Sequence, residues 1–341
     1  STDLDLSEEI VPCVEAHVQE NNVSQLSHFN DNDLTLDENS YIPASELVIT
    51  SLPFVLPSRL VIEHVFKSIM DDKEPIVLYR RCLSDVKFQI AQNDELEGEV
   101  NKNSHSSAKI LELTVDIDVV HGIYEGGLKT WECSLDLVEY LSIKSKEINF
   151  SGKKILEVYV DDPIRLGCGS ALPGIYLLST QHSICVDFQD YNEHVLKLVT
   201  MPNILINTVL RPQTDDISEI DIVEEINCLN QLKNSKFFKG DWNGLTDLLN
   251  LHSNQEKYDI ILSSETIYNL NSIPKLYNVI KHALKYPNGV AYIAAKTIYF
   301  GVGGGILSFC QLIEQDHVFE VNVVYTKTAH VRREILKLSF L

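Results

Sequence analysis

The sequence lacks the usual marks of metal-binding, disulfide-stabilised and membrane-spanning proteins. Its seven cysteines lie far apart and form no Cys-x-x-Cys pair, which argues against a zinc ribbon and against a disulfide framework. No apolar run approaches about 18 residues, and the first residues lack the basic start and apolar core of a signal peptide. We therefore expect reduced thiols, no bound metal, no membrane span, and a cytoplasmic and nuclear location.

Basic residues are missing from the first 50 positions, which hold eleven Asp and Glu and no Lys or Arg. This segment supplies −11 of the chain's net charge of −21. So acidic a surface repels phosphate backbones, which argues against direct nucleic-acid binding, and it suits a basic protein partner. Because Asn, Ser and Asp recur throughout, we expect residues 1–45 to be an acidic disordered leader.

The next segment, residues 46–120, is an N-terminal extension whose chemistry the sequence does not indicate. Leu60–Met70 has apolar residues at helical spacing. Ile76–Arg80 and Ile110–Val115 have the composition of strands, and the polar stretch between them is typical of a loop.

Residues 121–341 alternate strand-like and helix-like segments, which predicts an α/β domain with a Rossmann-like parallel sheet covered by helices on both faces. The chain ends in two strands with no helix between them, which predicts an antiparallel addition at one edge. Residues 211–233 are rich in acids and have few signals of order, so we expect an acidic insertion. The expected strands are Lys154–Val160, Ser183–Phe188, Lys236–Lys239, Tyr258–Leu262, Gly289–Ala295, Val318–Thr326 and Val331–Leu341. The expected helices are Trp131–Ile143, Ala171–Ser179, Asn192–Ile206 with a kink at Pro202, Trp242–Leu251, Lys275–Leu284 and Ile306–Gln315.

A glycine loop, Leu166–Pro173, follows the first expected strand of this domain. Such a loop lets a ligand approach bare backbone at a helix N-terminus, although it can also be a tight turn. The dinucleotide fingerprint needs a third glycine where this sequence has Leu172. The loop therefore disfavours hydride chemistry and favours a cofactor without a pyrophosphate.

Acidic residues follow the second and third expected strands. Asp190 lies where a carboxylate can accept both ribose hydroxyls of an adenosine, and its alternative role is a helix cap. Asp241 could meet the adenine edge with Trp242 beside the ring, and the alternative is a turn with a core tryptophan.

Two further motifs point to the reacting centre. Ser263–Tyr268 ends the fourth strand with hydroxyls, Glu265 and Tyr268, although Glu265 could also cap a turn. The segment Ala295–Gly305 places Tyr299 and Phe300 before four glycines, which suggests a mobile lip over a substrate or simply a flexible loop.

Together these features resemble the seven-strand S-adenosylmethionine-dependent methyltransferases. Tyr124–Cys133, which reads Tyr-Glu-Gly-Gly-Leu-Lys-Thr-Trp-Glu-Cys, looks like the entry motif of the protein-histidine methyltransferases of yeast and animals. The segments Phe188–Asn192, Thr200–Asn203, Ser263–Tyr268 and Tyr299–Gly305 are similar to that family in order and spacing, so the resemblance covers residues 120–341.

The resemblance implies methyl transfer from S-adenosyl-L-methionine to a histidine ring nitrogen of a large-subunit ribosomal protein, the L-three protein, by a monomer. By this analogy Trp131 lines the methionine end of the cofactor, Gly167 and Gly169 let it approach, and Asp190 holds its ribose. Substrate contacts are expected at the lip. They are Tyr299, Phe300, Gly301 and Gly303.

One segment departs from the family pattern Ile-Leu-Glu-Leu-Gly-Cys-Gly. Here Ile155-Leu156-Glu157 is followed by eight further residues, Val158–Arg165, and Arg165 stands directly before the loop in the acid's place. In the family that acid helps to hold the cofactor's ammonium group. Either Glu157 or Asp162 substitutes for it, or cofactor binding is impaired.

The chemistry itself favours a histidine target. A neutral imidazole has one lone-pair nitrogen, and an acceptor for the other N–H selects which nitrogen attacks. Glu265 is the candidate acceptor, and Tyr268 and Tyr299 could wall the pocket around the sulfonium. A lysine or small-molecule methyltransferase, or a non-catalytic binding module for a basic ribosomal protein, stays open as an alternative.

Overall fold

The computed structural model describes residues 11–12, 42–50, 57–67, 75–98, 130–159, 169–223, 225–328 and 330–341. The strand predicted at Ile110–Val115 lies outside these ranges, as do most of the leader and Gly167. The disorder of the leader therefore stays a prediction.

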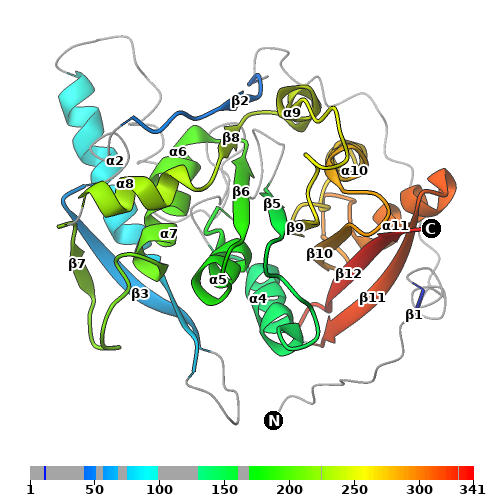
Figure 1. The fold of residues 1–341 in the computed structure, drawn as a ribbon, viewed down its shortest axis with the longest axis horizontal. Coiled ribbons are helices and arrows are strands. Elements are labelled where there is room, and N and C mark those ends of the chain that lie inside the picture. The colour runs from blue at the N-terminus through cyan, green and yellow to red at the C-terminus, as the bar shows by residue number, and fades with distance from the viewer. Residues whose placement is uncertain are drawn as a thin grey trace.

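A nine-stranded sheet forms the centre of the molecule, with the order β1-β11-β12-β10-β9-β5-β6-β8-β2 (Figure 1). Five neighbouring strands, β10, β9, β5, β6 and β8, run parallel, and β11 and β12 form an antiparallel pair at one side. The α/β fold and the closing antiparallel pair are as predicted. The strands are β1 (Val11–Pro12), β2 (Ser45–Glu46), β5 (Lys154–Val158), β6 (Cys185–Asp190), β8 (Phe237–Lys239), β9 (Ile260–Ser264), β10 (Val290–Lys296), β11 (Phe319–Lys327) and β12 (Arg333–Phe340).

The chain order reverses between β5 and β9 at the middle of the sheet. The chain runs outward from β5 through β6 to β8, and then returns to β9 and runs outward on the other side. In open α/β sheets, ligands bind at such a switch point, outside the carboxyl ends of the strands. The fold therefore places its ligand crevice beside the ends of β5 and β9.

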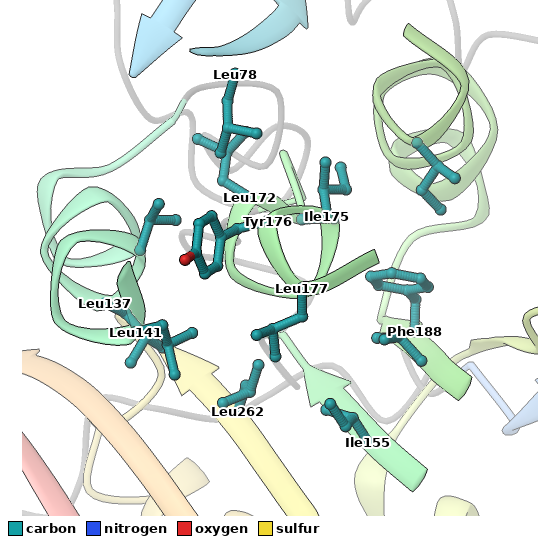
Figure 2. Close-up of a cluster of buried hydrophobic side chains, with 14 of the residues drawn as sticks. Leu78, Leu137, Leu141, Ile155, Leu172, Ile175, Tyr176, Leu177, Phe188 and Leu262 are labelled. Carbon is teal, nitrogen blue, oxygen red and sulfur yellow. The ribbon is translucent and has the colours of Figure 1, made fainter. Parts of the chain in front are cut away.

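Helices cover both faces of the sheet. Alternate residues of β5 point to opposite sides, so that Ile155 joins one hydrophobic cluster with α4, α5 and α7, and Leu156 joins another with α9, α10 and α11. Figure 2 shows the first cluster, where Leu137 and Tyr176 of the covering helices lie above the sheet residues Ile155 and Leu262. The helices are α4 (Glu132–Lys144), α5 (Leu172–Thr180), α6 (Glu193–Val195), the π-helix η2 (Leu196–Thr200), α7 (Met201–Asn207), α8 (Glu225–Lys233), α9 (Trp242–Leu249), α10 (Ser272–Ala283) and α11 (Ile306–Asp316).

The N-terminal extension contributes a second, three-stranded sheet with the order β4-β3-β7. Its strands are β3 (Arg59–Lys67), β4 (Val77–Arg81) and β7 (Glu219–Asp221), and the helix α2 (Leu83–Gly98) follows β4. The predicted helix at Leu60–Met70 is therefore wrong, because a bulge between His64 and Phe66 disturbs the alternation of strand β3. The prediction of a loop after Ile76–Arg80 is likewise wrong for Leu83–Gly98, which form the helix α2.

The acidic insertion is more ordered than predicted. Within residues 211–233, β7 pairs with β3 of the extension, and α8 buries Cys228 and Leu232 in the core. Exposed ion pairs of Arg59 with Glu219 and Asp221 accompany the β3–β7 pairing. The acids of this segment thus dock the N-terminal extension on the domain.

The thiols differ in part from expectation. Cys82, Cys133, Cys185 and Cys228 are free, whereas Cys310 in α11 is disulfide-bonded, which corrects the prediction of reduced cysteines at that position. No helix in the described ranges combines the length and the apolar character that a membrane crossing requires.

Candidate functional site

The carboxyl ends of the parallel strands bring the predicted polar residues to one edge of the sheet. Asp190 ends β6, Asp241 follows β8, Glu265 follows β9, and Lys296 ends β10. The strands are parallel neighbours in register, so these residues lie along the edge of the sheet at which the switch-point rule places a ligand.

The described end of the glycine loop leads directly into α5. Ser170 is buried, and Ala171 adopts a left-handed conformation with φ of 56° at the N-cap of the helix. The loop is held from behind by two side chains, because Thr200 Oγ1 donates to the Gly169 carbonyl at 2.7 Å and Asn203 Nδ2 donates to the Ser170 carbonyl at 3.0 Å. Gly169 therefore lies in the loop before α5, as the sequence predicted, and its contact with the cofactor stays a prediction.

Asp190 is a buried carboxylate with one oxygen left over. Its Oδ1 accepts the N–H of Asn192 at 2.8 Å, while its Oδ2 has no hydrogen-bond partner among the described residues. Burial raises the pKa of Asp190 to about 7, although the Asn192 N–H acts in the opposite direction. A buried polar atom without a partner is costly, so this oxygen is suited to an external donor.

Asp241 and Trp242 have structural roles that the sequence offered only as the alternative. Asp241 caps α9 by accepting the N–H of Asn243 at 2.7 Å, and its other oxygen pairs with Lys275 at 2.8 Å. Trp242 is fully buried, and its indole N–H donates to Gln189 at 2.7 Å. Contact of either residue with the cofactor stays a prediction.

Gln189 organises this side of the crevice, and sequence reasoning passed over it. Besides accepting from Trp242, its Oε1 lies 3.3 Å from the backbone N of Tyr159, and its Nε2 donates to the Gly240 carbonyl at 3.0 Å. The residue is completely buried. The sequence did contain a signal for Gln189, because it is an uncharged polar residue next to Asp190 in a buried strand.

Glu265 is buried, and one of its oxygens accepts a hydrogen bond, whereas the other has a charged neighbour but accepts no hydrogen bond from the described residues. Tyr299 Oη donates to Oε2 at 2.6 Å, and Lys296 Nζ lies 3.2 Å from Oε1. Burial and the Glu265 charge hold the pKa of Tyr299 well above its ordinary value, so Tyr299 remains a donor. Glu265 has a φ of 56°, and a non-glycine residue in this region indicates strain that the surroundings maintain.

Lys296 connects Glu265 to the residue expected at the methionine end of the cofactor. Its ammonium lies 5.1 Å from the centre of the Trp131 ring and 3.5 Å from Glu132. Burial acts to lower the pKa of Lys296, but the charges of Glu265 and Glu132 act against it, and the pKa is raised. Lys296 was missed as a functional residue, although its position at a strand end was a usable signal.

The predicted lip divides into a buried wall and an exposed tip. Tyr268 is fully buried and meets Tyr299 edge-to-face with ring centres 6.1 Å apart. The Gly304 N–H donates to the Tyr268 carbonyl at 2.9 Å, and an added Cβ on Gly304 would lie 2.2 Å from backbone, so only glycine allows this approach. Phe300 by contrast is 81% exposed.

The remaining lip residues include two glycines in left-handed conformations. Gly301 has a φ of 80° and Gly303 a φ of 79°, and Gly303 forms an isolated bridge with Asn269. The lip is thus attached to the segment that follows Glu265. Contact of Tyr299, Phe300, Gly301 or Gly303 with a substrate stays a prediction.

Glu157, the acid directly before the eight additional residues Val158–Arg165, accepts a hydrogen bond from α5. Its Oε2 accepts the Gly174 N–H at 2.8 Å, and a Cβ on Gly174 would lie 2.4 Å from this oxygen. Burial raises the pKa of Glu157 to about 8, although bonds from Tyr159 and Gly174 act to lower it. Asp162, the other possible substitute, lies outside the described residues.

The residues at this edge fit S-adenosylmethionine. The Oδ2 of Asp190 has no partner among the described residues and can accept from a ribose hydroxyl, and Gly169 at the described end of the glycine loop would let a ligand approach the backbone. Trp131 and Lys296 place an aromatic face and a cation near the switch point.

Comparison of the sequence with those of known proteins shows the family to which the chain belongs. No family model matches the chain. Histidine protein methyltransferase 1 of Schizosaccharomyces pombe is 31% identical over 326 residues, which cover 88% of this chain and 90% of that protein. This chain belongs to the histidine protein methyltransferase 1 family. The resemblance noted in the sequence motifs is thereby confirmed.

Other relatives match a smaller part of this chain. A histidine protein methyltransferase 1 homolog of Dictyostelium discoideum is 42% identical over 206 residues, covering 60% of this chain and 53% of that protein. The chain thus spans about half the length of this relative. Among solved structures, the pyocyanin biosynthetic protein PhzM has a TM-score of 0.40 at 13% identity, covering 75% of this chain and 69% of that one, which is too distant to bear on the chemistry.

Proposed function

We propose that this protein transfers a methyl group from S-adenosylmethionine to a histidine ring nitrogen of a large-subunit ribosomal protein. The observation that carries the proposal is the buried Asp190 carboxylate, which has one oxygen open at the carboxyl end of β6. Membership of the histidine protein methyltransferase family supports the reaction class, and the sequence motifs support the target.

The protein's part in cofactor binding is recognition and placement. Asp190 would accept the ribose hydroxyls, the backbone of Gly169 would let the ligand approach, and Trp131 would line the methionine end. The bound cofactor supplies a methyl group already activated on a sulfonium. The protein therefore needs to align the acceptor and exclude water, and it needs no covalent catalysis of its own.

Glu265 is suited to orient the substrate imidazole. A carboxylate oxygen can accept more than one hydrogen bond, so the contacts with Tyr299 and Lys296 leave acceptor capacity for a ring N–H. The other ring nitrogen would take the methyl group while the bond from that methyl to sulfur breaks and leaves S-adenosylhomocysteine; the ring would become cationic, and the Glu265 charge would stabilise it. Glu265 can then take the N–H proton, which leaves a neutral methylated ring.

The charge of the protein supports a basic protein as the substrate. The chain carries −21 overall, and such a field steers positively charged partners toward the surface. The exposed Phe300 at the lip offers an apolar contact for a segment of that partner. With a ribosomal protein as the substrate, we also propose a cytoplasmic and nuclear location for this protein, acting as a monomer without direct nucleic-acid contact.

The test combines binding with methylation. Calorimetry of the full chain with S-adenosylmethionine comes first, because no binding would favour a non-catalytic module. Methylation of purified ribosomal proteins is then followed by mass spectrometry of the modified residue. A methylated histidine in a large-subunit protein supports the proposal, whereas a methylated lysine or only a methylated small molecule contradicts it.

A further inference from the structure

The helix after β6 grips the glycine loop through two side chains that are three residues apart. Thr200 Oγ1 donates to the Gly169 carbonyl at 2.7 Å, and Asn203 Nδ2 donates to the Ser170 carbonyl at 3.0 Å. Thr200 and Asn203 are completely buried. Two successive carbonyls of the loop thus have side-chain donors on the same helix, which fixes the orientation of these peptide planes.

The helix has an unusual shape at this point, and the N-terminal extension completes it. The π-helix η2 ends at Thr200, two residues before Pro202 of α7, and π-segments occur preferentially at functional sites. Pro202 has no N–H, so the carbonyl of Leu198 four residues earlier lacks its α-helical donor. Arg81 of β4 supplies one, because its Nη1 donates to that carbonyl at 3.0 Å.

Strand β4 also holds Asn203 directly. The backbone N–H of Arg81 donates to Asn203 Oδ1 at 2.8 Å, which orients the amide so that Nδ2 faces Ser170. One turn later, Asn207 accepts from the Tyr79 N–H at 2.9 Å and donates to the Tyr79 carbonyl at 2.7 Å. Asn207 therefore completes the ladder of β4 as a neighbouring strand would.

These contacts form a continuous buried path from the N-terminal extension to the cofactor loop. We propose that Thr200 and Asn203 are positioning residues for cofactor binding, and that β4 of the N-terminal extension holds them in place. The inference rests on the proposed function, since it concerns the same cofactor. It gives the extension a role that its sequence did not indicate.

The physical reason lies in the loop's own geometry. The loop ends in the left-handed Ala171 at the N-cap of α5, where Pro173 has no N–H and the Gly174 N–H already donates to Glu157, so a ligand would meet the backbone of the loop itself. Small rotations of the Gly169 and Ser170 peptides would move the backbone groups of the loop. Hydrogen bonds to their carbonyls from completely buried side chains restrict such rotations, so the loop pays less ordering entropy when it binds.

The decisive variant is Thr200→Val, which retains the shape of the side chain and removes its donor to Gly169. We expect its affinity for S-adenosylhomocysteine, measured by calorimetry on the full chain, to fall about tenfold, the effect of one lost buried hydrogen bond. Thr200→Ser retains the hydroxyl and should restore the affinity. Thr208→Val is the control, because Thr208, the C-cap of α7, donates from Oγ1 to the Ile204 carbonyl at 2.7 Å and not to the loop.

A second variant covers the case in which Thr200→Val does not fold. Asn203→Asp retains the acceptor for Arg81 but loses the donor to Ser170, so it should also weaken binding. Wild-type affinity in either folded variant would overturn the proposal. Loss of fold in both would overturn it as well, since the contacts would then be needed for folding rather than for positioning. Failure of the proposed function is separate, because it would already be visible as no binding by the wild-type protein.

Discussion

The two sides of the crevice treat their buried carboxylates differently. On the ribose side, Asp190 uses one oxygen for a local backbone contact and leaves the other without a partner among the described residues. On the reacting side, Glu265 accepts a hydrogen bond from Tyr299 on one oxygen, and its other oxygen accepts none from the described residues but has the Lys296 ammonium 3.2 Å away. Both side chains are almost fully buried, so the difference lies in their partners and not in their exposure.

This contrast separates recognition from chemistry. An open buried oxygen gains a partner only when the ligand arrives, so Asp190 contributes to affinity. A carboxylate already fixed by a phenol and an ammonium needs no rearrangement when charge develops beside it, so Glu265 contributes to rate. Binding and turnover should therefore respond to different substitutions.

The largest effect is expected from Asp190→Ala on cofactor affinity. Two hydrogen bonds from ribose hydroxyls to a charged acceptor contribute about 1.5–3 kcal/mol each, so binding should fall below calorimetric detection. Asp241→Ala is the control, because it removes a helix cap and should lower stability by about 1 kcal/mol with a smaller change in affinity. Unchanged affinity of Asp190→Ala would reduce this residue to its contact with Asn192.

Glu265→Gln should act on the rate instead. Removing one preorganised charge typically costs on the order of a hundredfold to a thousandfold in maximal rate, while the Michaelis constant and the cofactor affinity should change little. Single-turnover methylation of the ribosomal protein measures this effect. A nearly equal rate would remove Glu265 from the mechanism.

The chain offers a matched control for this substitution. Glu139 in α4 also has a tyrosine and a lysine as partners, Tyr325 at 2.9 Å and Lys327 at 2.8 Å, but it lies outside the group at the ends of β9 and β10. Glu139→Gln should therefore leave the maximal rate within about twofold of wild type. A loss as large as that of Glu265→Gln would attribute both effects to general stability.

A pH series tests the ribose side without changing its shape. The ionised form of Asp190 accepts ribose hydroxyls, and its pKa in the free protein is about 7. Below that pH the Asp190 carboxyl is protonated in the free protein and must lose its proton when the cofactor binds. The affinity for S-adenosylmethionine should therefore fall by up to about tenfold per pH unit as the pH decreases from 7. Asp190→Asn, which does not titrate, should bind weakly and show a flat profile. A wild-type profile that is equally flat would contradict this assignment.

The smallest effect concerns a third buried carboxylate, Glu157, whose partner is the Gly174 N–H. Its folded pKa of about 8 exceeds its ordinary value, so its contribution to stability is complete at low pH and is lost as the pH rises toward 8. Glu157→Gln should therefore melt a few degrees above wild type at about pH 9 and lose this advantage near pH 4, since about 1 kcal/mol corresponds to about 2–4 °C. Melting curves at the two pH values suffice, and a constant difference between the proteins would be contrary to the prediction.

Regular periodicity made most of the methyltransferase domain predictable. Buried parallel strands such as Ile260–Ser264 are short apolar runs between helical segments, and they were found within a few residues. Strand β3 was read as a helix because its bulge after His64 breaks the alternation. The three-residue strand β7 was missed, because its order comes from pairing with β3, which is distant in the sequence.

The candidate site was predictable where position along a strand determines it. Asp190 and Glu265 stand at strand ends, so their presence at the crevice followed from the alternation of strands and helices. The partners of these residues did not follow, because Lys296 approaches Glu265 from a neighbouring strand. Trp242 was expected beside the cofactor, but a fully buried indole bonded to Gln189 depends on tertiary packing that one sequence does not reveal.

The order of the large sheet has a consequence for aggregation. Its two outermost strands, β1 on β11 and β2 on β8, come from the N-terminal part of the chain and are two residues long. Long unpaired strand edges invite edge-to-edge association between molecules. Here the outermost strands are short, one containing Pro12, which cannot donate a hydrogen bond, and the other the charged Glu46, and β1 pairs with two of the nine residues of β11. Because β11 and β12 follow β10 in the chain, the edge of β10 stays unpaired until both strands have been synthesised, and chains truncated before β11 should be more prone to self-association.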